Sequence, residues 1–93
     1  MSAAPRRMGA WRCRRPRTFL EAAGAELRER RVERGLRLVD VAERAGMTAG
    51  QVSRLERGQR RPRPATLARV LELLGLTLPE LRRAAELRLR PPL

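Results

Sequence analysis

The chain has 93 residues, of which 22 are basic and 10 acidic, so its formal net charge is +12 at pH 7. Such a charge favours a polyanionic partner. Histidine is absent and Cys13 is the only cysteine, which excludes an internal disulfide, a zinc cluster and histidine- or cysteine-based catalysis. We therefore predict no enzyme, no metal and no cofactor.

The length fits one small domain with short tails. We expect residues 1–20 to form a disordered arginine-rich arm, residues 21–89 to form the folded domain and residues 90–93 to form a tail. No apolar run approaches the roughly 20 residues that span a bilayer, and the N-terminus lacks the apolar stretch of a secretory signal. We expect a cytoplasmic protein, and the arginine-rich composition indicates a bacterial source.

The first 20 residues hold six arginines and no acidic residue. Pro5 and Pro16 oppose regular structure in this arm. Three interpretations stay open: an arm that follows phosphates or enters a minor groove, a solvated tail, or a targeting peptide. Trp11 fits either base stacking or packing against the domain.

The folded part begins with a helix that we expect from about Glu21 to Arg34. Its apolar side consists of Ala22, Ala23 and Leu27, and Gly35 ends it. The next helix has apolar residues at positions i, i+3, i+4 and i+7, which form one helical face: Leu38, Val41, Ala42 and Ala45. Gly46 ends this helix, because glycine adopts the left-handed conformation without steric cost.

Another helix follows directly after Gly46. Thr48 and Gln51 have the spacing of a capping box, which predicts a helix over residues 49–57. Val52 and Leu55 are its only strongly apolar residues, so they form a narrow stripe that can pack on the preceding helix. The opposite face is polar and carries arginines, which suits insertion into a major groove.

The remaining chain predicts a loop and two further helices. Residues 59–64 form a basic loop that its prolines keep from being helical. Pro64 suits the first position of the next helix, which ends at Gly75 and whose buried stripe consists of Leu67, Val70, Leu71 and Leu74. Thr77 and Glu80 form another capping box.

The last helix is expected to run to about Arg88. Its core-facing residues are predicted to be Leu78, Leu81 and Ala85. Ala84 and Leu87 point elsewhere and form a second apolar edge, which fits self-association or a partly exposed tail.

Taken together, residues 24–82 resemble the Cro and lambda-repressor type of helix-turn-helix domain, also called the Xre family. The resemblance is carried by Leu27, Arg31, Gly35-Leu36, Val41-Ala42, Gly46-Met47-Thr48, Val52 to Gly58, Pro62, Pro64, Thr66-Leu67, Leu74-Gly75 and Leu78 to Leu81. It implies an all-α, compact five-helix domain that binds duplex DNA and regulates transcription as a repressor. It also implies a homodimer on a two-fold site, for which the second apolar edge of the C-terminal helix is the candidate contact.

The resemblance assigns roles residue by residue. The base-reading positions are Ala49, Gly50, Ser53 and Arg54, of which Arg54 is the strongest candidate because arginine can donate two hydrogen bonds to guanine. The phosphate-binding candidates are Arg31, Arg37, Thr48, Gln51, Arg57, Arg60, Arg61 and Arg63. Arg31 is also expected to pair with Glu56 through a bidentate contact.

The chain departs from the family pattern at two places. Ala49 and Gly50 stand where relatives often have amide or charged side chains, so direct readout there is limited. Arg37-Leu38 stands where a capping residue and a glutamine are common. Two other functions stay open: an antitoxin that binds a toxin partner as well as its operator, and an arginine-rich binder of nucleic acid without sequence preference.

Overall fold

The structure, a computed structural model, describes residues 15–90. Within this range it has five helices and no strand: α2 (Phe19–Glu33), α3 (Leu38–Ala45), α4 (Ala49–Glu56), α5 (Pro64–Leu74) and α6 (Leu78–Leu89). The all-α, five-helix prediction is confirmed. The predictions for Trp11, Cys13 and residues 91–93 lie outside the described residues.

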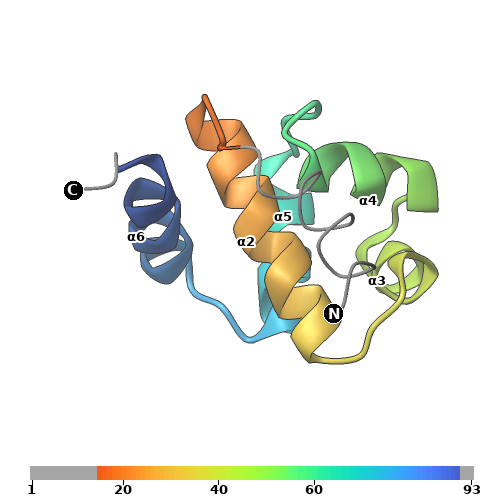
Figure 1. Cartoon of the computed structure of the whole chain (residues 1–93). Coiled ribbons are helices and arrows are strands. Elements are labelled where there is room, and N and C mark those ends of the chain that lie inside the picture. The colour runs from red at the N-terminus through yellow and green to blue at the C-terminus, as the bar shows by residue number, and fades with distance from the viewer. Residues whose placement is uncertain (1–14, 91–93) are drawn as a thin grey trace, which may run out of the picture.

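Helix α2 runs through the middle of the molecule and contacts α4, α5 and α6. Figure 1 shows α6 on one side of α2 and the α3–α4 pair on the other side, with α5 behind. Helix α3 packs on both α4 and α5. As a result, the helix expected to read DNA and the C-terminal helix lie at opposite ends of the molecule.

The core comes from the predicted apolar stripes. Its largest fully buried side chains are Leu27, Val41, Val52, Val70 and Leu74, and burying each contributes about 1.5–3 kcal/mol. They come from α2, α3, α4 and α5, so each of these helices is held through its own stripe. The narrow stripe of α4 is buried as predicted, since both Val52 and Leu55 are inaccessible to solvent.

The capping predictions for α4 and α6 are confirmed. The Thr48 Oγ1 accepts from the Gln51 backbone N–H at 3.1 Å, and the Gln51 Oε1 accepts from the Thr48 N–H at 3.0 Å. Thr77 and Glu80 repeat this reciprocal pair at 3.2 and 2.9 Å. Gly46, at the end of α3, has a φ of 71°, the left-handed conformation that turns the chain into α4.

The predicted start of α2 was wrong by two residues. Thr18 is the N-cap, and its Oγ1 accepts from the Glu21 N–H at 3.1 Å. Glu21 in turn accepts from the Arg17 backbone N–H at 2.7 Å. The Thr-x-x-Glu spacing of residues 18–21 is a helix-start signal, so the helix begins inside the segment assigned to the arm.

The prediction that Leu78 packs in the core was also wrong. Leu81 and Ala85 are buried, but Leu78 is 48% exposed. Leu78 is the first residue of α6, and its side chain faces an open groove between α2, α5 and α6. The next helical turn, which carries Leu81, is the first that reaches the core.

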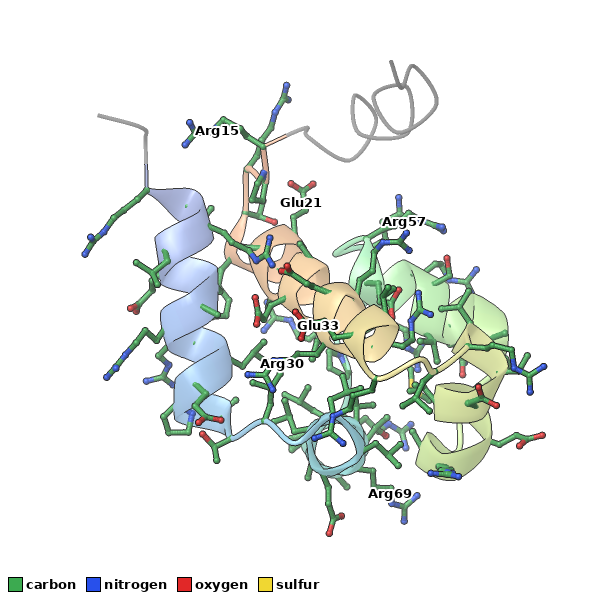
Figure 2. All side chains as sticks on the ribbon, turned by 60° about the horizontal axis from the view of Figure 1, so that its bottom comes forward. Arg15, Glu21, Arg30, Glu33, Arg57 and Arg69 are labelled. Carbon is green, nitrogen blue, oxygen red and sulfur yellow. The ribbon has the colours of Figure 1, made fainter. Side chains whose placement is uncertain are left out.

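Ion pairs attach α6 to α2. Arg88 donates to Glu26 at 2.9 and 3.2 Å and also to Glu29. Arg30 lies between the two helices (Figure 2), with its Nε 3.8 Å from a Glu26 carboxylate oxygen. The Arg88 pairs join residues 62 and 59 positions apart, and sequence patterns did not predict them, whereas Arg30 and Glu26 are four residues apart within α2. None of the helices in residues 15–90 has the length and apolar content to cross a membrane.

Candidate DNA interface

Helix α4 presents a polar face to solvent because its apolar stripe is buried. Gly50, Arg54 and Arg57 are exposed on this face, and Ala49 and Ser53 are half-buried. The structure thus brings the four predicted base-reading positions together on one short helix. Their contacts with DNA stay predictions.

Arg54 is a long, exposed side chain on this face of α4. Among the described residues, no hydrogen bond or ion pair occupies its guanidinium. A Cβ built on Gly50 would lie 3.9 Å from the Arg54 Nη1 and from the Thr48 Oγ1. The guanidinium therefore lies beside the first turn of α4, above a residue without a side chain.

Arg57 and Ser53 are already joined in the unbound protein. The Arg57 Nη1 donates to the Ser53 Oγ at 2.6 Å, and its Nε donates to the Gln59 Oε1 at 3.4 Å. Figure 2 shows Arg57 pointing outward from the end of α4. This contact was not predicted, although the i, i+4 spacing of the two residues is the signal for it.

The Arg31–Glu56 pair is present and buried. The Arg31 Nε donates to one Glu56 oxygen at 2.7 Å and the Nη2 to the other at 3.2 Å, while the Nη1 donates to the Leu36 carbonyl at 2.8 Å. The two residues are 7% and 8% exposed. Three of the five guanidinium N–H donors are thereby used, and the pair holds the end of α4 against α2.

The basic loop after α4 carries the next predicted phosphate ligands. Arg61 and Arg63 are exposed, and Arg63 is the N-cap residue of α5. Arg60 is half-buried, and its Nε is shielded and has no hydrogen-bond partner within residues 15–90. The loop therefore offers two exposed cations directly after α4.

Arg37 is the N-cap residue of α3, and it is hydrogen-bonded to Asp40 in the first turn of that helix. Its backbone N–H donates to the Asp40 Oδ2 at 2.7 Å, and its guanidinium donates to the same carboxylate at 3.0 and 3.2 Å. Arginine has no acceptor for the helix N–H groups, so Asp40 supplies the capping contact. The role of Asp40 was not predicted, although its position three residues after Arg37 is the signal for it.

This geometry agrees with a family profile described as Helix-turn-helix, which matches residues 27–81. The chain belongs to this helix-turn-helix family, of the Xre, lambda-repressor type. It is a DNA-binding transcriptional regulator.

Two solved structures of the clp gene regulator ClgR from Corynebacterium glutamicum are similar to this helix-turn-helix protein. One is 31% identical with a TM-score of 0.74, and the match covers 80% of this chain and 95% of that one. The other is 32% identical with a TM-score of 0.74, covering 81% of this chain and 79% of that one. No curated protein matches the chain.

Acid should destabilise this helix-turn-helix domain through its capping carboxylates. Hydrogen bonds from the Arg37 guanidinium and backbone N–H lower the pKa of Asp40, and the Thr77 backbone N–H lowers the pKa of Glu80. A carboxylate whose pKa is lowered in the folded state stabilises the fold at pH values above its ordinary pKa of about 4. This stabilisation is lost as the pH falls through the lowered pKa. The free energy of unfolding, measured in urea, should be nearly constant between about pH 5 and 7, because histidine is absent, and fall below about pH 4.

The matched control is the double variant Asp40→Asn, Glu80→Gln, which keeps the side-chain shapes but cannot ionise. Its stability should fall less steeply with acid than that of the native chain. An identical acid slope in both proteins would assign the effect to the general repulsion of a cationic chain.

Proposed function

We propose that this regulator binds a specific duplex sequence through the outer face of α4 and represses transcription by occupying a promoter. The observation that carries this proposal is that α4 has one buried and one exposed face. Val52 and Leu55 are buried, whereas Arg54 is exposed and has no hydrogen-bond or ion-pair partner among the described residues. An arginine in this state can donate two hydrogen bonds to the O6 and N7 of guanine. ClgR, the similar protein, is itself a gene regulator.

Specificity in this proposal depends on few side chains. Ala49 and Gly50 can contribute only a contact with a thymine methyl group or a close backbone approach, so Arg54, Arg57 and DNA shape carry the readout. Ser53 contributes its hydroxyl once Arg57 turns toward the DNA. The phosphate contacts come from Thr48, Gln51, Arg37, Arg60, Arg61 and Arg63, and from Arg31 through the N–H donors that Glu56 and Leu36 leave free.

A dimer on a two-fold site completes the proposal, since one such domain contacts only a half-site. Half-sites lie one helical turn, roughly 34–36 Å, or a multiple of that distance from each other. The outer edge of α6 is available for pairing, because Leu87 is 56% exposed and Ala84 beside it is half-buried. This edge is remote from α4, so a dimer formed through it leaves both α4 faces open.

The test is selection from a random duplex library at about 150 mM salt, where unspecific phosphate binding is already weakened. We expect an enriched two-fold motif that contains a guanine in each half. Binding without enrichment that disappears as salt rises would favour the unspecific arginine-rich binder and contradict the proposal.

Two variants separate base reading from phosphate binding. Arg54→Ala should remove about 1–3 kcal/mol of discrimination at one base position in each half-site, with a smaller effect on random DNA. Arg61→Ala should weaken specific and random duplexes alike and reduce the salt slope by about one unit. Affinities are measured by fluorescence anisotropy across a salt series; equal losses on both duplexes for Arg54→Ala would contradict its role.

A further inference from the structure

An apolar groove of about 560 Å³ lies between α2, α5, the loop before α5 and the start of α6. Phe19 and Leu78 line it and are 44% and 48% exposed. The floor and walls are apolar and include Leu20, Leu27, Pro62, Leu67 and Leu71. Large apolar side chains exposed in one hollow mark an interaction surface.

The charges on the groove are of one sign. Arg61 from the loop and Arg82 from α6 line it, and no acidic residue does so within the described part of the chain. Arg82 is exposed, and no ion pair with a described residue occupies it. An apolar hollow flanked by two uncompensated cations is complementary to apolar side chains flanked by carboxylates.

This charge argues against occupants from the chain itself. A second copy packed symmetrically through the groove would bring the same arginines toward each other, on chains that each carry +12. Residues 1–14 contain four arginines and no acidic residue, so this segment is repelled by the same two cations. The partner must supply the negative charge.

We infer that the groove binds an acidic amphipathic segment of another protein, with apolar anchors seated between Phe19 and Leu78 and carboxylates paired with Arg61 and Arg82. A helix presents such anchors at i, i+3, i+4 and i+7. Arg61 also belongs to the proposed phosphate-binding set, so the inference is tested at Arg82 and Leu78, which belong to neither the base-reading nor the phosphate-binding set.

The test selects peptides of about four helical turns from a random displayed library on the full-length native protein. The best synthetic peptide is then titrated against native protein, Arg82→Glu, Leu78→Ser and the matched control Arg83→Glu, whose exposed side chain on α6 does not line the groove. We expect acidic sequences with helical apolar spacing. Affinity should fall about fivefold or more in Arg82→Glu and Leu78→Ser and less than twofold in Arg83→Glu.

Three outcomes would overturn the inference. Failure to enrich acidic amphipathic peptides is the first, and equal affinities for Arg82→Glu and Arg83→Glu are the second. The third is a native dimer in sedimentation that Leu78→Ser converts to a monomer, which would assign the groove to a second copy. Circular dichroism confirms that each exposed-site variant is folded before titration.

Discussion

Replacing Glu56 by alanine is expected to lower the free energy of unfolding by about 3–5 kcal/mol, because it leaves the buried Arg31 guanidinium without its carboxylate. Both side chains are less than 10% exposed, so water compensates poorly for the lost carboxylate. The Nη1 contact with the Leu36 carbonyl remains, but it does not neutralise the charge. Urea denaturation monitored by circular dichroism measures the loss.

A double variant distinguishes the cost of an unpaired buried charge from the cost of lost side-chain packing. Arg31→Met with Glu56→Leu removes both charges and keeps apolar volume, so stability should recover most of the loss. As an exposed comparison, Asp40→Ala breaks the Arg37–Asp40 pair, where solvent screens the charges, and it should cost far less. A loss below about 1 kcal/mol in Glu56→Ala would show that Arg31 finds another partner.

Replacing Gly24 by alanine is expected to destabilise the domain by about 1–3 kcal/mol, although alanine favours helices. Gly24 is buried where α2 crosses the end of α4. A Cβ there would lie 2.5 Å from the Leu55 carbonyl oxygen and against that of Glu56. Because these atoms are backbone, no rotamer change relieves the overlap, and α2 must move away from α4. A loss of 1 kcal/mol lowers the melting temperature by about 4–8 °C.

The matched control makes the same substitution where space is open. At Gly50, in α4, the nearest atoms to a new Cβ lie 3.9 Å away, so Gly50→Ala should stabilise the domain by up to about 1 kcal/mol through helix propensity alone. Opposite signs for the two variants in thermal unfolding are the expected result. Stabilisation by Gly24→Ala would mean that the α2–α4 crossing adjusts freely.

Local sequence patterns were sufficient to predict the helices. Apolar spacing in α3, α4 and α5 identified their buried faces, and the Thr48–Gln51 and Thr77–Glu80 pairs marked two helix starts. These signals work because hydrogen bonds within a helix and its caps join residues at most four positions apart. The polar face of α4 followed from the same periodicity. The Arg31–Glu56 pair was predicted from the family resemblance, because no local spacing connects residues 25 positions apart.

The sequence by itself therefore determined the order and type of the helices and the inner faces of α3, α4 and α5, together with a strong positive charge and a polar helix suited to DNA. Only the tertiary structure decided what depends on how helices cross. The close contact at Gly24, the Arg88 pairs that attach α6 and the exposure of Leu78 all belong to this class. The physical reason is that such contacts depend on the distance and angle between helices, which the packing of the whole core decides.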